Sequence, residues 1–332
     1  MPRRNADTAD PPELEDDQPT ALVFIDIPAC CGGVLDPGLP LNRQRRSSRR
    51  GPDELFQGVG GIRPRDMEQL RRATQKLTPK GLRILRGPFP FVVSEFLDRL
   101  AEKRDFRYMT FLREPVDRAV AHYHEALDRP VEGLPPLDPG ASFADALEAG
   151  YIQDNLQTRM LSGSHEPFGV VTEAMLDAAK RNLREKFLFV GLAERLEESL
   201  VLARMRLDVG AAVYRQELSR LRAPSDVAAE TGELAREINR YDMELYDFAK
   251  ELFDSAPELG ELEFQCEAAA VRASRGNGEI EVTTPVPPAF EGGVQEWQML
   301  VRARAECHRL EWELDENGSG ALVPASGSEA DG

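Results

Sequence analysis

The chain has 332 residues, of which 41% are hydrophobic and 30% are charged, and its 58 acidic against 41 basic side chains give a formal net charge of -17. This apolar content is sufficient for a folded core, and four cysteines are too few for a disulfide scaffold. The acidity disfavours nucleic-acid partners. No apolar run approaches the roughly 18 residues of a membrane helix. The N-terminal residues also lack the apolar core of a secretory signal, so we expect a cytoplasmic protein without an integral membrane segment.

Short apolar runs alternate with amphipathic segments along the chain, which predicts an α/β fold with a central parallel sheet flanked by helices. Strands are expected at 21–27, 83–85, 106–112 and 187–191. Helices are expected at 92–102, 115–127, 142–149, 152–162, 175–187 and 196–207. Pro115 suits the first turn of its helix. Apolar residues spaced by three and four then predict one long helix through 234–252, with Ser225 as its N-cap.

Composition divides the chain into five parts. Residues 1–20 are a disordered acidic tail, and 21–256 form the α/β domain. A Gly-, Pro- and Thr-rich stretch places a linker at 257–293, followed by an extra helix at 294–314 and a second disordered tail at 315–332. This division leaves open a scaffold or interaction protein, in which the extra helix pairs with a helix of a partner.

The first predicted strand runs into a loop with two glycines, in the segment FIDIPACCGG. Such a loop at a strand end is a candidate phosphate cradle, because its backbone N–H groups can point at an anion. Gly32 and Gly33 are the candidate cradle residues. Cys30 and Cys31 are adjacent, which suits neither a disulfide nor a zinc site, and we expect no metal.

A second segment, LREPVDRAVAHY, places Arg113 at the end of a strand and Arg118 in the helix that follows. Ligands of α/β sheets bind at the carboxyl ends of the strands, and arginine makes forked contacts with phosphate. Both arginines are therefore candidate phosphate ligands. The alternative is a surface network with Glu114 and Asp117.

The pattern Arg-Glu-Pro-x-x-Arg, with Tyr123 five residues after its second arginine, resembles the 3′-phosphate motif of carbohydrate sulfotransferases. Three other segments resemble the same family, namely DNLQTRMLSG from residue 154, FVGLAER from residue 189 and NRYDMELY from residue 239. Over residues 21–254 the chain is similar to the bacterial sulfotransferase family related to heparan sulfate 2-O-sulfotransferases.

This resemblance implies a fold of the P-loop nucleotide-binding type. It implies 3′-phosphoadenosine 5′-phosphosulfate as donor, and a hydroxyl group of a glycan or small alcohol as acceptor. Gly32, Gly33, Arg113, Arg118 and the position of Ala121 are then the nucleotide-binding positions. In-line sulfuryl transfer needs a cation near the leaving oxygen and a general base near the acceptor.

The chain departs from the family pattern at three chemical positions. Ala29 stands where the family has the lysine that contacts the sulfonate, Pro88 stands where it has a histidine suited to be the base, and Ala121 stands where it has a serine. Two functions stay open: a sulfotransferase that uses other residues, or a catalytically inactive protein that binds nucleotide, glycan or a protein partner. The residues that could compensate are Arg43, Arg45, Arg46, His122 and His124.

Overall fold

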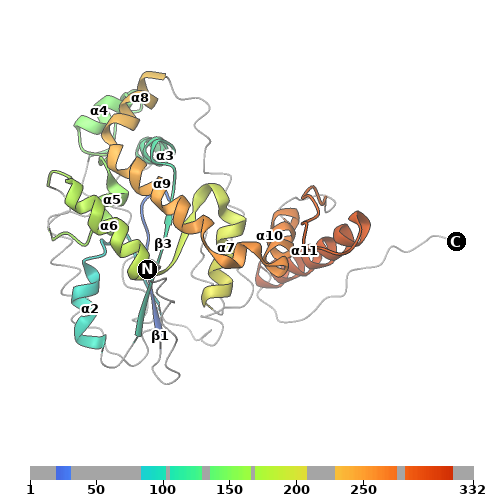
Figure 1. The fold of residues 1–332 in the computed structure, drawn as a ribbon. Helices are drawn as coiled ribbons and strands as arrows, with labels where there is room; N and C mark the ends of the chain where they lie inside the picture. Colours follow the sequence, from blue (N-terminus) through green and yellow to red (C-terminus); the bar gives the residue numbers. More distant parts are fainter. Residues whose placement is uncertain are drawn as a thin grey trace, which may run out of the picture.

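The computed structural model describes residues 20–30, 84–101, 105–128, 135–165, 169–207, 229–274 and 281–316. Its centre is a parallel sheet of four strands in the order β2-β1-β3-β4. Figure 1 labels two of them, β1 and β3, in the middle of the fold. The strands are β1 (Thr20–Ile25), β2 (Ile84–Gly87), β3 (Asp105–Leu112) and β4 (Phe187–Leu192). Each lies within one or two residues of the range expected from its apolar run, so the predicted α/β fold with a central parallel sheet is confirmed.

The strands are apolar because the sheet is covered on both faces, as parallel sheets usually are. Phe24, Phe111 and Phe189 lie on three neighbouring strands and stack edge to face, with ring centroids 6.2 and 5.4 Å apart. All three are almost fully buried and belong to the largest core cluster. The aromatic contacts therefore fix how β1, β3 and β4 lie against each other.

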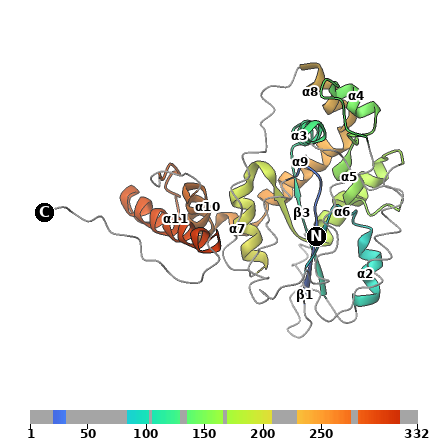
Figure 2. The same ribbon diagram turned by 180° about the vertical axis from the view of Figure 1, so that it is seen from behind.

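Helices surround this sheet, with α2 and α7 on opposite sides of the strands in both views (Figures 1 and 2). In chain order they are α2 (Val93–Ala101), α3 (Pro115–Asp128), α4 (Phe143–Glu148), α5 (Leu156–Leu161), α6 (Glu173–Glu185), η2 (Ala193–Arg195), α7 (Leu196–Leu207), α8 (Ala229–Ile238), α9 (Arg240–Asp254), η5 (Pro257–Gly260), α10 (Leu262–Ser274) and α11 (Val294–Glu316). None of these helices is long and apolar enough to cross a membrane, as far as the described residues show.

One predicted helix is wrong in extent and another is wrong in continuity. The helix expected at 152–162 is only α5, because Asn155 has a left-handed backbone with φ of 45° and the helix begins after it. The long helix expected through 234–252 is two helices, α8 and α9, which meet at Asn239. Its expected N-cap, Ser225, lies outside the described residues. Both differences arise from side-chain contacts between distant segments, which are described with the site below.

The C-terminal part also differs from the expected linker. Within 257–293 the chain forms η5 and α10, and α11 covers the range in which an extra helix was expected. In both views α10 and α11 extend from the α7 side of the domain (Figures 1 and 2). Trp297 is 1% exposed and packs with Val301 and Ala305 against the small residues of α10. The two helices therefore form a hairpin with a core of its own. The expected tails at 1–20 and 315–332 lie almost wholly outside the described residues.

Gly191 in β4 offers a test of the packing of this sheet. A Cβ added there would lie 2.6 Å from the ring of Phe111 and 2.9 Å from that of Phe189. Because both rings are buried, we expect Gly191→Ala to lower the free energy of unfolding by about 1–3 kcal/mol. Gly232, inside α8, has open space around its Cβ position. The matched variant Gly232→Ala should therefore gain about 0.5–1 kcal/mol. Urea denaturation of both variants measures the difference, and equal stabilities would contradict this packing.

Candidate functional site

The candidate site lies at the carboxyl edge of the sheet, where β1, β2 and β3 end together. Ile25 pairs with Gly87 on one side and with Thr110 on the other. The hydroxyl of Thr110 donates to the carbonyl of Ile25 over 2.9 Å, and the N–H of Asp26 donates to the carbonyl of Gly87 over 2.9 Å. These bonds bring the loop after β1, the start of the Gly87–Pro90 turn and the residue after β3 to one edge, where α/β sheets bind their ligands.

The loop after β1 closes in a tight turn. The N–H of Cys30 donates to the carbonyl of Ile27 over 3.0 Å, and Ala29 has a left-handed backbone with φ of 63°. The structure thus places Ala29, whose side chain is a methyl group, in the turn that follows β1. The cradle glycines Gly32 and Gly33 lie outside the described residues, as do the compensating arginines at 43, 45 and 46.

Arg113 lies directly opposite this turn and is 4% exposed. Its guanidinium Nη1 donates to the carbonyl oxygen of Ala29 over 3.2 Å. The side chain of Gln157 bonds to both backbone groups of Arg113. The Arg113 N–H donates to Gln157 Oε1 over 3.0 Å, and Gln157 Nε2 donates to the Arg113 carbonyl over 2.9 Å. The structure therefore brings Arg113 and Ala29 together at the predicted edge. Sequence analysis missed Gln157, whose only signal is its place within the DNLQTR segment.

Arg118 has a different environment from Arg113. It is fully buried, and its Nη2 donates to the carbonyl of Gln153 over 3.3 Å and to Oδ1 of Asn239 over 3.4 Å. Its Nε and Nη1 have no hydrogen-bond partner within the described part of the chain. Arg118, which the sequence predicts to be a nucleotide ligand, is thus enclosed by protein in the structure. Ala121, one turn further along α3, is 9% exposed and presents a methyl group.

The two histidines considered as replacement bases lie two turns into α3. Burial, and then the charge of Arg118, lower the pKa of His122 to about 4, so its imidazole is neutral near pH 7. Its Nδ1 is buried without a partner among the described residues. His124 stacks beside Tyr123, with ring centroids 5.2 Å apart. His122 therefore shares the helix face of Arg118, while Arg113 precedes the helix.

Carboxylates occupy the backbone N–H groups at the start of α3. Glu194 Oε1 accepts from the N–H of Glu114 over 2.8 Å, and Glu114 Oε2 accepts from the N–H of Asp117 over 2.8 Å. The hydroxyl of Tyr246 donates to the other oxygen of Glu194 over 2.5 Å. Burial raises the pKa values of Glu114 and Asp117, and Asp117 feels the opposing charge of Arg113. The start of this helix is thus capped by carboxylates of the protein itself.

The first turns of α5 and α9 are each capped by a side chain from the segment of the other helix. Asp242 of α9 accepts from the N–H groups of Gln157 and Thr158, in the first turn of α5, over 3.0 and 2.7 Å. Asn155, just before α5, accepts from the N–H groups of Tyr241 and Asp242, in the first turn of α9, over 2.8 and 3.2 Å. This reciprocal capping ties the DNLQTR and NRYDMELY segments together.

Asn239 completes the same buried network. Its Oδ1 accepts from Asn155 N–H and from Arg118, and its Nδ2 donates to the carbonyl of Ala235 over 2.7 Å. The amide of Asn155 donates in turn to the carbonyl of Ile238 over 2.7 Å. The last carbonyls of α8 and the first N–H groups of α9 are therefore satisfied by side chains. This is the physical reason why the predicted long helix breaks at Asn239.

More than half of the chain, residues 99–280, matches the sequence model of the family described as galactose-3-O-sulfotransferase. The chain belongs to this sulfotransferase family. The match includes β3, Arg113, the reciprocal caps, β4 and α10. It begins after β1 and the Ala29 turn, and it ends before α11.

Curated relatives are also sulfotransferases. The chain is 28% identical over 193 residues to heparan-sulfate 6-O-sulfotransferase 1-A of Danio rerio, covering 48% of this chain and 46% of the relative. It is 29% identical over 184 residues to heparan-sulfate 6-O-sulfotransferase 2 of the same organism, covering 46% and 39%. It is 28% identical over 182 residues to the human heparan-sulfate 6-O-sulfotransferase 1, covering 46% and 44%. The chain thus spans less than half the length of these relatives.

These findings confirm that the sequence resembles sulfotransferases. The narrower prediction, a relation to the bacterial group and to 2-O-sulfotransferases, stays a prediction. The segments on which the resemblance rested are now seen to have mainly structural roles, because DNLQTR and NRYDMELY cap each other and FVGLAER supplies Glu194 to α3. Within the described residues no cluster of side chains is suited to a metal ion.

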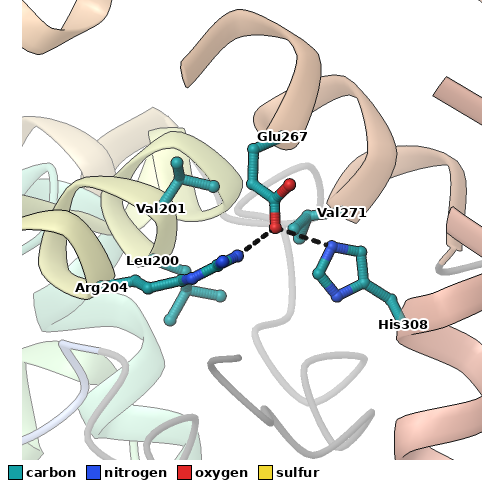
Figure 3. A pocket seen from close by; sticks show the side chains of 6 residues that line it. All are labelled: Leu200, Val201, Arg204, Glu267, Val271 and His308. Carbon is teal, nitrogen blue, oxygen red and sulfur yellow. Dashed lines mark hydrogen bonds and ion pairs between the residues drawn. The ribbon is translucent and has the colours of Figure 1, made fainter. Parts of the chain in front are cut away.

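A small pocket of this chain lies away from the candidate site, between α7, α10 and α11 (Figure 3). Glu267 of α10 is 5% exposed and contacts three basic side chains there: Arg204, Arg304 over 2.7 Å, and His308 over 3.0 Å. Burial alone would raise the pKa of Glu267, but the bonds from His308 and Arg304 and the charge of Arg204 lower it to about 2. The cluster joins the hairpin of α10 and α11 to α7.

The lowered pKa of Glu267 predicts that the free energy of unfolding depends on pH. Because its pKa in the folded protein lies below the ordinary 4.5, its contribution is full above about pH 4.5 and is lost as the pH falls toward 2. We expect Glu267→Gln to lower the free energy of unfolding at pH 7 by about 1.5–3 kcal/mol. The variant should also lose less stability between pH 5 and 3 than wild type. Urea denaturation measures both effects. Glu263→Gln, an exposed site on α10, is the control, and an equal loss in both variants would contradict the role of Glu267.

Proposed function

We propose that this protein binds 3′-phosphoadenosine 5′-phosphosulfate at the carboxyl edge of its sheet and transfers the sulfuryl group to a hydroxyl of a carbohydrate. The observation on which this rests is Arg113, a guanidinium fixed at the end of β3 opposite the Ala29 turn. Family membership supports the donor, and the printed names of the relatives, all sulfotransferases of heparan sulfate, support a glycan acceptor. In this reaction the acceptor oxygen attacks sulfur while the bond between sulfur and the bridging oxygen of the donor breaks. Adenosine 3′,5′-bisphosphate leaves, and the proton of the acceptor hydroxyl goes to a base.

Arg113 is expected to contribute directly to the affinity for the phosphates. A charge-assisted hydrogen bond contributes about 1.5–3 kcal/mol, so Arg113→Ala should weaken binding of adenosine 3′,5′-bisphosphate roughly 10- to 150-fold. Calorimetric titration measures this change. The control is Arg107→Ala, at the opposite end of β3, where the guanidinium pairs with Asp105 over 2.5 Å. Affinity that is unchanged in Arg113→Ala, or equally reduced in both variants, would contradict a nucleotide site at this edge.

A second candidate function is nucleotide binding without transfer, and two observations favour it. Ala29 brings no charge to the turn after β1, and Pro88, directly after β2, has no group that accepts a proton. The group that Arg113 brings to this turn is a guanidinium, which stabilises negative charge but stays protonated and therefore cannot accept a proton. On this second reading the site retains affinity for the nucleotide and has lost its reactive side chains.

Restoring the two side chains distinguishes the two candidate functions. Ala29 already has a Cβ at a positive φ, so lysine adds no new backbone clash there. We expect Ala29→Lys with Pro88→His to raise sulfuryl transfer by a factor of about 10² or more, since a lost oxyanion donor costs about 10²–10³ and a lost base about 10²–10⁴. Chromatography of adenosine 3′,5′-bisphosphate formed with heparan-type and galactose-containing acceptors measures it. Wild-type turnover equal to that of the double variant would exclude the binding-only function, and turnover by the double variant alone would support it.

A further inference from the structure

The side chain of Gln157 bonds to both chain segments of the candidate site. It is fully buried as the second residue of α5. Its Oε1 accepts from the N–H of Arg113 over 3.0 Å and from the thiol of Cys30 over 3.5 Å, and its Nε2 donates to the carbonyl of Arg113 over 2.9 Å. The amide thus contacts the turn after β1 and the residue after β3 at the same time.

The Gln157 amide bonds to Arg113 as a neighbouring strand would. β3 ends at Leu112, so the N–H and the carbonyl of Arg113 have no neighbouring strand beyond it. An amide side chain offers the same donor and acceptor as a peptide group, and Gln157 presents both to a single residue. Because an unpaired buried backbone group is costly, this contact satisfies the Arg113 backbone past the strand end. The guanidinium is then directed to Ala29.

Gln157 is itself held from the other side. Its own N–H donates to Asp242 Oδ2 over 3.0 Å, and Asp242 is fixed by the N–H groups at the start of α5 and by the charge of Arg118. Burial raises the pKa of Asp242, while these bonds and Arg118 oppose the change. A chain of contacts therefore runs from the buried network through Gln157 to the arginine at the sheet edge.

We propose that Gln157 is a positioning residue, whose amide fixes Arg113 and the Ala29–Cys30 turn in the arrangement that binds the phosphates of the nucleotide. This inference rests on the proposed function, since it concerns the same site. It assigns Gln157 no contact with the nucleotide.

Gln157→Glu tests the role because its effect depends on pH. An ionised carboxylate still accepts from the Arg113 N–H, but its second oxygen faces the Arg113 carbonyl and cannot donate. A protonated carboxyl restores the donor. We expect the affinity for adenosine 3′,5′-bisphosphate, taken as the ratio of variant to wild type at each pH, to lie within about twofold at pH 5. The ratio should fall about tenfold or more by pH 9, which corresponds to about 1.4 kcal/mol.

Two further variants define the comparison. Gln157→Met keeps the length of the side chain and removes the donor and the acceptor, so its affinity should be low at every pH. Gln298→Glu is the matched control, because it makes the same chemical change at an exposed position of α11. Melting temperatures are recorded in the same series. If Gln157→Glu unfolds at pH 9, its melting temperature should recover toward wild type at pH 5 while that of Gln157→Met does not.

The outcomes separate the two proposals. Wild-type protein that binds no bisphosphate overturns the proposed function and this inference together. Wild-type binding that needs Arg113, with an affinity ratio for Gln157→Glu that is flat between pH 5 and pH 9, overturns the inference alone. A ratio that falls with rising pH for Gln157→Glu, stays low for Gln157→Met and stays near one for Gln298→Glu supports it.

Discussion

The structure depends on the satisfaction of buried backbone groups where short helices meet behind the sheet edge. Each helix start leaves N–H groups without intrahelical partners, and burying them unpaired would cost about 1–3 kcal/mol each. Asp242 accepts from N–H groups of α5, and Asn155 accepts from N–H groups of α9. Asn239 donates to a carbonyl near the end of α8. Every member of the set has partners from a segment more than 80 residues away in sequence or from a neighbouring turn. Because a partly satisfied network is worse than an apolar core, these residue types cannot change one at a time without loss of stability.

This constraint explains which parts of the structure the sequence predicts. The four strands follow from short apolar runs, and the start of α3 follows from Pro115, because both are local signals. The break at Asn239 has no local signal, since the apolar spacing continues across it and the bond partner, Asn155, is distant in sequence. Arg118 shows the same limit in the site. Its motif is typical of a phosphate ligand, but only the tertiary structure reveals that it bonds to Gln153 and Asn239.

The Ala29 turn and the buried network are held by different contacts. The network lies within the part of the chain that matches the family, and the Ala29 turn lies before it. The backbone of that turn is determined by its own hydrogen bond and by Arg113, and neither involves the side chain of residue 29. A change of the side chain at residue 29 therefore alters the charge of the turn without removing a contact that supports the fold.

The charges near Arg113 matter more for this site than the net charge of the chain. A chain with a net charge of -17 repels an anionic donor at long range, but at physiological ionic strength charges are screened beyond about 8 Å. Binding then depends on the groups around Arg113, which include Glu114 and Asp117 at the start of α3. Their raised pKa values mean that the ionised forms are disfavoured where they lie, so lowering the pH removes negative charge from the neighbourhood of Arg113 before it affects ordinary surface carboxylates. The charge at this edge thus comes from one guanidinium beside two carboxylates whose ionised forms are disfavoured by burial, and the amide of Gln157 bonds to the backbone that carries the guanidinium.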